Sequence, residues 1–255
     1  MKKSIIRGIS LILICAILLT LFPVGAIAHS EQEYIETTST FKTEPMVAGG
    51  GEHTVALQNN GTVWTWGQNA FGQLGLGSPI LRTATPVQVQ NLSEVTAVAA
   101  GASHTVAVRN DGTVWTWGNN NTGQLGDGTT IERRTPVRVQ NLGGIIAVAA
   151  GNQHTLALRN DGTVWAWGLN TSGQLGDGTT TNHHTPQQVQ NLSTVTTIAA
   201  GGERSVALRN DTTVWDWGWN GFTPQSTPAP RQNLNNITAI ATSANHTVAL
   251  RNDRM

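Results

Sequence analysis

The chain repeats itself with a period of about fifty residues. The phrase NGTVWTWG at residues 60–67 returns as DGTVWTWG at 111–118, as DGTVWAWG at 161–168 and as DTTVWDWG at 211–218. Eight of the nine tryptophans belong to these four copies. Self-similarity at a fixed period predicts a repeat architecture, in which each unit buries its apolar faces against its neighbours.

A second phrase recurs in register with the first. AGGGEHTVAL at residues 48–57 matches AAGASHTVAV, AAGNQHTLAL, AAGGERSVAL and ATSANHTVAL further along the chain. Its histidine position is occupied by His53, His104 and His154, then by Arg204, and then by His246. The last step is shorter because the fourth unit lacks the GQLGDG found at 123–128 and 173–178.

Each unit has the pattern of four short strands. HTVAL and TVWTW are separated by Asn-Gly or Asp-Gly turns that suit a tight hairpin, and TPVQVQNL and VTAVAAG supply two further strands. Four strands per unit of this length are typical of propeller blades. The sequence therefore predicts an all-β fold, a β-propeller of about four units plus a partial fifth, with units near 47–97, 98–147, 148–197, 198–239 and 240–255.

Alternation along a strand places both tryptophans of each phrase on one face. Because an indole buries about 200 Å², we expect these side chains to fill the space between blades. The repeated histidines, each followed by Thr, are expected to hold the fold by local hydrogen bonding. The residues predicted to be structural are Trp64, Trp66, Trp115, Trp117, Trp165, Trp167, Trp215, Trp217, His53, His104, His154 and His246.

The first 28 residues have the order of a secretory signal peptide. Lys2, Lys3 and Arg7 precede an apolar run that is shorter than the roughly 20 residues a membrane helix needs, and Ala26-Ile27-Ala28 fits a cleavage site. We expect a signal peptide at 1–28, a linker at 29–46, and a secreted or cell-surface protein with no membrane attachment after cleavage.

Removal of that segment changes the charge and the cysteine content. The only cysteine, Cys15, is lost, and three of fifteen basic residues are lost while all fifteen acidic residues stay, so the balance is 12 − 15 = −3. Disulfides and thiol chemistry are therefore not expected in the mature chain. A weakly acidic chain lacks the basic footprint that nucleic acids require, so nucleic-acid binding is not expected.

No motif for catalysis, metal binding or phosphate binding appears. The nucleophile elbow and HExxH are absent, and Gly-Gln-Leu-Gly-Asp-Gly is not followed by the Lys-Ser/Thr of a phosphate loop. The histidines of different blades are expected to lie too far apart for one zinc ion, which needs ligands within about 2.1 Å. We predict a non-enzymatic protein without metal or cofactor.

The segments that follow the GQLG-type turns differ from unit to unit. They read SPILRTAT, TTIERRT, TTTNHHT and GFTPQST. A constant frame with variable loops is how rigid scaffolds present binding surfaces, and aromatic and arginine residues are favoured anchors. For Trp219, filling of space left by the missing turn is an equal alternative to contact. The candidate binding residues are Phe71, Arg82, Arg133, Arg134, His183, His184, Trp219 and Phe222.

These phrases together resemble a known repeat. GxxHTxALxxDGTVWxWGxNxxGQLGDG…TPxxV, from about Val47 onward, resembles the repeat of the regulator of chromosome condensation family. The resemblance implies a propeller, commonly of seven blades, in which the histidine, the Trp-Gly and the GQLG turn belong to the scaffold. The family's founder promotes nucleotide exchange on a small GTPase, whereas its secreted bacterial relatives include the type II β-lactamase inhibitor protein, which binds its target through loops on one face.

Two functions from different classes remain open. The first is a secreted scaffold that binds a protein or cell-wall partner through loops on one face, and the second is inhibition of an extracellular enzyme such as a β-lactamase; nucleotide exchange is a remote third. Four units and a fifth beginning are fewer than seven blades. We expect either a truncated gene product or an open arc whose free edges self-associate.

Overall fold

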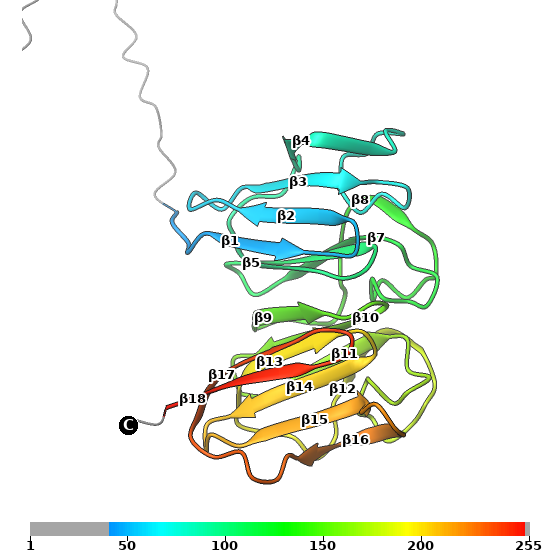
Figure 1. The fold of residues 1–255 in the computed structure, drawn as a ribbon. Helices are drawn as coiled ribbons and strands as arrows, with labels where there is room; N and C mark the ends of the chain where they lie inside the picture. Colours follow the sequence, from blue (N-terminus) through cyan, green and yellow to red (C-terminus); the bar gives the residue numbers. More distant parts are fainter. Residues whose placement is uncertain (1–40, 253–255) are drawn as a thin grey trace, which may run out of the picture. The chain divides into compact units, whose positions relative to one another are not determined.

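The computed structural model describes residues 41–252 of the 255-residue chain, and all of its regular elements there are β-strands (Figure 1). The predicted signal peptide and most of the predicted linker lie outside the described residues. Residues 41–252 form no apolar helix of a length that could cross a bilayer. The all-β expectation from the sequence is confirmed.

Four antiparallel four-stranded sheets follow one another along the chain, and a two-stranded sheet comes last. The first two sheets consist of β1 (Met46–Gly49), β2 (His53–Leu57), β3 (Val63–Gln68) and β4 (Arg82–Gln88), then β5 (Val95–Ala100), β6 (His104–Arg109), β7 (Val114–Gly118) and β8 (Arg133–Arg138). The rest consist of β9 (Ile145–Ala150), β10 (His154–Arg159), β11 (Val164–Gly168) and β12 (His183–Gln188), then β13 (Val195–Gly201), β14 (Arg204–Arg209), β15 (Val214–Trp219) and β16 (Pro224–Pro230), and finally β17 (Ile237–Thr242) with β18 (Thr247–Arg251).

We call these sheets blades 1 to 5 in chain order. Within each complete blade the strands pair in sequence order, as consecutive hairpins. The expected unit boundaries fall inside strands β5, β9 and β13, because the VTAVAAG-type segment pairs with the HTVAL-type strand that follows it. Each blade therefore begins a few residues earlier than the sequence units near 98, 148 and 198.

The hairpin between the second and third strand of each complete blade depends on a left-handed backbone position. Gly112 and Gly162 occupy it with φ of 74° and 80°. In blade 4 the same position holds Thr212 at φ 66°. A β-branched residue is unfavourable in that region, whereas glycine adopts it freely.

The apolar core lies between consecutive blades. One cluster joins Val55 and Val63 of blade 1 to Trp117 of blade 2, and the next joins Val106 of blade 2 to Trp167 of blade 3. A third joins blade 3 to Trp217 of blade 4. Each blade thus covers the face of the blade before it, as expected for stacked repeats.

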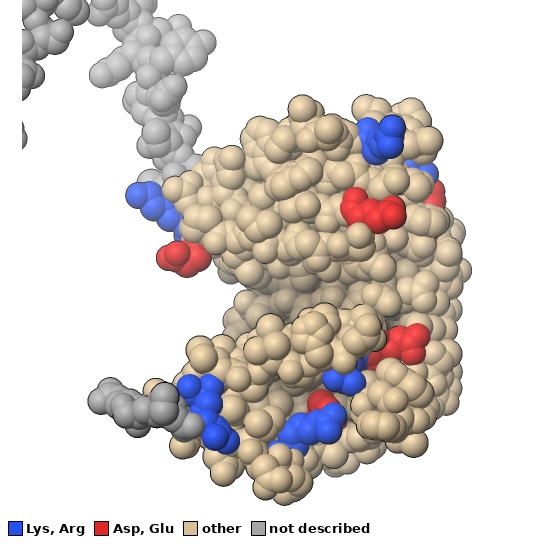
Figure 2. Space-filling model, in the orientation of Figure 1, with Lys and Arg blue, Asp and Glu red and all other residues tan. Residues whose placement is uncertain are grey.

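The innermost strands of all five blades meet around one hollow. Its wall is formed by the turns that follow these strands, and it holds about 330 Å³. Figure 2 shows the surface hollowed between the first blade and β18, with few charged side chains nearby. The hollow is lined by Gly49–Gly51, Ala100–Ala102, Ala150–Asn152, Ala200–Gly202 and Thr242–Ala244.

Candidate functional site

The third strand of each complete blade ends in an excursion before the fourth strand begins. The four excursions span residues 69–81, 119–132, 169–182 and 220–223. Because all four blades have the same strand order, the excursions emerge at the same end of successive blades (Figure 1). We call the surface made by these excursions and the first residues of the fourth strands the loop face.

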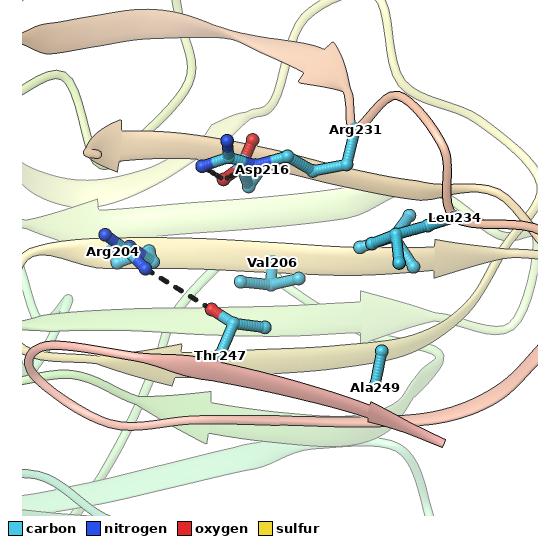
Figure 3. A pocket seen from close by; sticks show the side chains of 8 residues that line it. Arg204, Val206, Asp216, Arg231, Leu234, Thr247 and Ala249 are labelled. Atoms are coloured by element: carbon cyan, nitrogen blue, oxygen red, sulfur yellow. Dashed lines mark hydrogen bonds and ion pairs between the residues drawn. The ribbon is translucent and has the colours of Figure 1, made fainter. Parts of the chain in front are cut away.

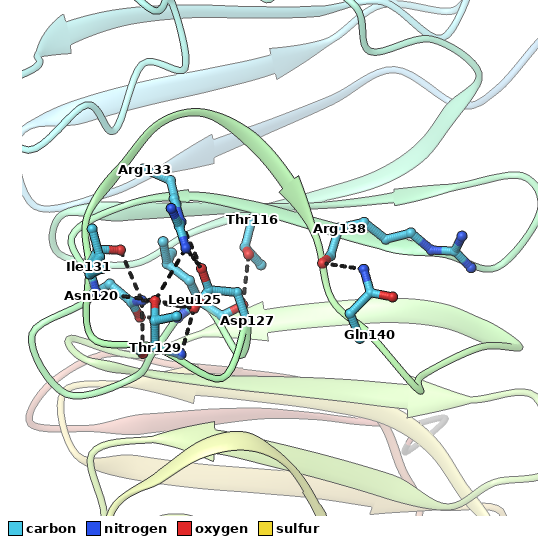
Figure 4. Close-up of polar contacts among 9 residues, drawn as sticks. All are labelled: Thr116, Asn120, Leu125, Asp127, Thr129, Ile131, Arg133, Arg138 and Gln140. Carbon is cyan, nitrogen blue, oxygen red and sulfur yellow. Dashed lines mark hydrogen bonds and ion pairs between the residues drawn. The ribbon is translucent and has the colours of Figure 1, made fainter.

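A single asparagine organises each long excursion. In blade 2 the Asn120 side-chain amide donates to Asp127 Oδ1 at 3.1 Å and to the Ile131 carbonyl at 3.1 Å, and its oxygen accepts from the Leu125 N–H at 3.0 Å (Figure 4). Asn170 repeats the bonds to Asp177 and Leu175, and Asn69 repeats the bond to Leu74. A buried amide with all of these partners holds the loop backbone in one conformation.

The aspartate of the GQLGDG turn anchors the start of the fourth strand. Arg133 Nε donates to Asp127 Oδ2 at 2.7 Å (Figure 4), and Asp127 is nearly buried. Burial acts to raise the pKa of Asp127, but hydrogen bonds from Thr129 and Arg133 outweigh it and hold the pKa below its usual value. In blade 3 His183 Nε2 lies 2.7 Å from Asp177 Oδ2, in a direction that makes no hydrogen bond.

Arg134 and His184 lie against the preceding blade. Arg134 Nη2 donates to the Ala70 carbonyl at 2.8 Å, and a Cβ added at Gly72 would lie 2.6 Å from the Arg134 Cα. His184 covers Gly123 in the same way. These two side chains therefore connect neighbouring excursions, and Arg134 is brought beside the loop that carries Phe71.

The other four candidate residues are exposed. Arg82 lines a depression of about 490 Å³ beside Glu52 and Gln68 in blade 1. Phe71 is 38% exposed, Trp219 is 40% exposed and Phe222 is 88% exposed. Trp219 precedes and Phe222 lies within one short excursion that is held by Asn220, whose side-chain oxygen accepts from the Phe222 and Thr223 N–H groups.

Sequence reasoning missed three apolar residues on this surface. Ile80 is 50% exposed, Leu81 is 64% exposed and Ile131 is 60% exposed. They stand in the variable segments, next to the arginines that were selected as candidates. An aliphatic residue at an otherwise polar loop position, where no strand pattern buries it, was the signal that could have identified them.

Behind the loop face, a repeated polar network ties the blades together. His53 Nε2 lies 2.9 Å from Thr105 Oγ1, and Thr105 Oγ1 donates to the Gln73 carbonyl at 2.8 Å. Because the one hydroxyl hydrogen is used in that bond, the histidine must donate from Nε2. His104 with Thr155 and His154 with Ser205 repeat the contact at 3.0 Å.

The three histidines are neutral in this network. Burial lowers the pKa of His53 to about 4, of His104 to about 3 and of His154 to about 4. Their Nδ1 atoms have no hydrogen-bond partner in the described part of the chain. No group of three His, Cys, Asp or Glu side chains that could hold a metal ion occurs among residues 41–252.

The geometry thus defines a β-propeller repeat scaffold with a rigid loop face. A family model described as RCC1-like domain matches residues 29–225. The chain belongs to the RCC1-like family, the regulator of chromosome condensation repeat family indicated by the sequence phrases.

Curated relatives match over part of their length. The chain is 47% identical over 83 residues to the human E3 ubiquitin-protein ligase HERC2, and 40% identical over 89 residues to the ultraviolet-B receptor UVR8 of Arabidopsis thaliana. These matches cover 32% and 34% of this chain, but 2% and 20% of the relatives. The chain therefore spans a small part of the curated relatives that it matches.

Solved structures share the fold. Yeast RCC1 (Prp20), solved with Kap60 bound, has a TM-score of 0.70 and 27% identity, over 81% of this chain and 53% of that chain. Human WBSCR16 has a TM-score of 0.72 and 24% identity, over 82% of this chain and 60% of that chain. The propeller architecture predicted from the repeats is confirmed. In the described residues, every sheet is open and none is closed on itself.

Proposed function

We propose that this protein is an exported, non-enzymatic scaffold that binds another protein through its loop face. One observation carries the proposal: Leu81, Ile131 and Phe222 are more than half exposed on excursions of three different blades that emerge at the same end. Exposed apolar side chains grouped on one surface of a folded protein are typical of an interaction site.

The rigidity of the excursions supports this function. The asparagine and aspartate bonds fix the loop backbone before any partner arrives, so little conformational entropy is lost on binding. Arg82 and Phe71 lie on the same surface and add the residue types that anchor protein interfaces. The partner that fits is a protein with its own apolar patch, ringed by polar groups.

The comparisons and the sequence agree with this proposal. Yeast RCC1 has been solved with a protein, Kap60, bound to it, so a protein of this family binds a protein partner. Export is inferred from the charge, apolar run and cleavage pattern of residues 1–28. The loop face of this chain carries its own side chains, so the identity of the partner does not follow from the relatives.

The proposal can be tested by capture from culture supernatant. We expect the immobilised protein to retain one or a few proteins, and a Leu81→Ser/Ile131→Ser/Phe222→Ser variant to lose them. The matched control is Ile146→Ser, since Ile146 is 56% exposed at the start of β9, at the opposite end of its blade. Equal loss in the control variant, or retention by the loop-face variant, would reject the loop face as the binding surface.

Two further assays separate the alternatives. Co-sedimentation with purified peptidoglycan reports a cell-wall partner, and an assay of extracellular β-lactamases with added protein reports inhibition. Inhibition that the loop-face variant loses would identify the partner as an enzyme of that class. Binding to peptidoglycan alone would replace the protein partner with a cell-wall partner.

A further inference from the structure

A cavity of about 300 Å³ lies between blades 2 and 3. Blade 2 contributes its GQLGDG turn and the two residues that follow Val139, and blade 3 contributes a tryptophan of β11 and the middle of β12. This volume is at the small end of the range that ligand pockets occupy, so the cavity suits one small molecule or one unit of a polymer. The residues that line it include Gln140, Asn141, Trp165 and Pro186.

The repeat builds the same junction between two other pairs of blades. Because the residue types at the three junctions are nearly the same, a difference in hydrogen bonding shows which junction keeps polar groups unused. The equivalent residues are Gln90, Asn91 and Trp115 between blades 1 and 2, and Gln190, Asn191 and Trp215 between blades 3 and 4.

The indole N–H of Trp165 differs from its equivalents. Trp115 and Trp215 each donate from Nε1 to the hydroxyl of the threonine two residues earlier, at 3.2 Å and 3.1 Å. Trp165 Nε1 is buried and has no hydrogen-bond partner among residues 41–252, although Thr163 stands at the same position. A buried donor without an acceptor is unfavourable, so a ligand that supplies an oxygen here gains affinity.

The ring of Trp165 is held in place by Arg159. The guanidinium carbon of Arg159 lies 4.5 Å from the centre of the indole ring, a cation–π contact that covers one face of the ring. The rest of the side chain lines the cavity. The aromatic wall is therefore fixed before a ligand arrives, so little conformational freedom is lost on binding.

The backbone of this junction also keeps unused groups. Between blades 3 and 4, the Gln190 N–H donates to the Gly176 carbonyl at 3.0 Å. The equivalent N–H of Gln140 and carbonyl of Gly126 form no hydrogen bond in residues 41–252, and both residues line the cavity. One backbone donor and one backbone acceptor are therefore available at its wall.

Two exposed side-chain amides complete the polar lining. Gln140 Nε2 donates to the Arg138 carbonyl at 3.3 Å (Figure 4), and its side-chain oxygen accepts no hydrogen bond within the described part of the chain. The Asn141 side chain makes no hydrogen bond there either. Because an amide offers both donors and an acceptor, these two side chains can pair with hydroxyl groups of either role.

The lining offers no free charge. Asp127 is its one ionisable residue, and its carboxylate already accepts from Asn120 and Thr129 through Oδ1 and from Arg133 through Oδ2. A charged ligand would therefore lose its hydration without gaining a counter-charge. A neutral ligand with many hydroxyl groups and one apolar face fits better, and a pyranose ring combines these two properties.

We propose that the cavity between blades 2 and 3 binds one uncharged pyranose unit of a glycan. The C–H face of the sugar packs against Trp165 beside Pro186, and its hydroxyl groups exchange hydrogen bonds with the Gln140 and Asn141 amides. This site goes beyond the proposed binding of a protein through the loop face, because the apolar residues that carry that proposal do not line the cavity.

The test uses the full chain and three sugars, each added alone: methyl β-glucoside, methyl α-mannoside and N-acetylglucosamine. We expect at least one of them to bind saturably, with a Kd of about 1–10 mM, the affinity expected for a ligand of about a dozen non-hydrogen atoms. Nuclear magnetic resonance follows the binding. The indole N–H resonance of Trp165 should shift, whereas those of Trp115 and Trp215 should stay in place.

A pair of glycine variants provides the decisive comparison. Asn141→Gly should weaken sugar binding about tenfold, because it removes the amide while glycine keeps the left-handed backbone at φ 57°. Asn191→Gly, at φ 55° in the junction of blades 3 and 4, is the matched control and should leave binding unchanged. The Leu81→Ser/Ile131→Ser/Phe222→Ser variant should also bind the sugar normally, so this test and the test of the loop face can fail independently.

Four results would overturn the proposal. They are the absence of saturable binding by all three sugars, equal weakening by both glycine variants, equal shifts of the three indole resonances, and binding of glucuronic acid in place of the neutral sugars.

Discussion

His104 Nε2 lies 3.0 Å from Thr155 Oγ1, so a side chain of blade 2 holds a side chain of blade 3 that is 51 residues away in sequence. From the sequence we expected a local hydrogen-bonding role for these histidines, each of which is followed by Thr. The bond instead crosses to the next blade, because the histidine and the residue after it face opposite sides of the sheet.

Loss of this bond should destabilise the stack of blades. We expect His104→Ala to lower the free energy of unfolding by about 2–4 kcal/mol, because Thr155 loses a buried donor and the ring leaves a cavity. His246→Ala should change it by less than about 0.5 kcal/mol, since His246 is exposed. Urea denaturation of both variants measures the difference, and equal effects would contradict a role for the inter-blade bond.

Acid should destabilise the protein through the same histidines. Their pKa values of about 3 to 4 when folded lie below the value of 6.5 that they have when unfolded. The unfolded chain therefore binds more protons, and the stability that is fully present above pH 6.5 is lost progressively as the pH falls towards 4. Each ring contributes a slope of up to about 1.4 kcal/mol per pH unit.

The slope can be assigned to individual rings. We expect His154→Gln to reduce the slope of the free energy of unfolding against pH, between pH 6.5 and 4. The reduction should correspond to about one bound proton. Asp111, whose pKa is lowered by hydrogen bonds from Thr113, affects stability only at pH values below that window. Titration near pH 6.5 of the imidazole resonances assigned to His53, His104 and His154 in the folded protein would disprove the neutral buried state.

The second tryptophan of the phrase should contribute differently to stability in different blades. Trp117 is fully buried between blades, whereas Trp66, its equivalent in blade 1, is half-buried. Trp117→Ala should therefore cost about 3–5 kcal/mol and Trp66→Ala markedly less. Guanidinium denaturation monitored by circular dichroism compares them, and equal costs would show that burial by the preceding blade is unimportant.

Gly101 is required for space rather than for backbone freedom. A Cβ at this position would lie 2.2 Å from His104 Cε1 and 2.5 Å from the Gly151 carbonyl oxygen. We expect Gly101→Ala to lower the free energy of unfolding by about 1–3 kcal/mol, and the melting temperature should fall accordingly. Gly143→Ala is the matched control, since a Cβ there meets nothing within 4 Å, and its melting temperature should stay near that of the wild type.

One substitution should make the protein more stable. Thr212 occupies, at φ 66°, the hairpin position that Gly112 holds in blade 2. Because a left-handed conformation costs a β-branched residue about 1–2 kcal/mol, Thr212→Gly should raise the free energy of unfolding by up to about 1 kcal/mol after the entropy of glycine is counted. Gly112→Thr should have the opposite effect, and a change of the same sign in both variants would refute the explanation.

The repeat phrases allowed the strands and the propeller to be predicted, because apolar alternation and Asp-Gly turns act locally. The unit boundaries could not be placed, since VTAVAAG pairs as well in principle with the strand before it as with the strand after it. The contacts of Arg133 and Arg134 could not be predicted from the sequence either. Arg133 pairs with Asp127, and Arg134 donates to the Ala70 carbonyl, which is 64 residues away. Their roles as binding residues stay predictions.

The pocket that lies between β14, β15 and β18, on the face of blade 4, shows a similar limit (Figure 3). Arg204, Asp216 and Arg231 are visible in the sequence as departures from the repeat. Only the packing shows that all three line one cavity. A residue that breaks a repeat is informative once the position it replaces is known to be buried.

The seat of every buried tryptophan is made by residues that precede it in the chain. Trp117 rests on blade 1, Trp167 on blade 2 and Trp217 on blade 3. A polypeptide that emerges from a ribosome or an export channel with its N-terminus first thus completes each receiving surface before the indole that fills it appears. Assembly of the blades can keep pace with emergence, and no finished blade has to wait for a distant segment to cover its tryptophans.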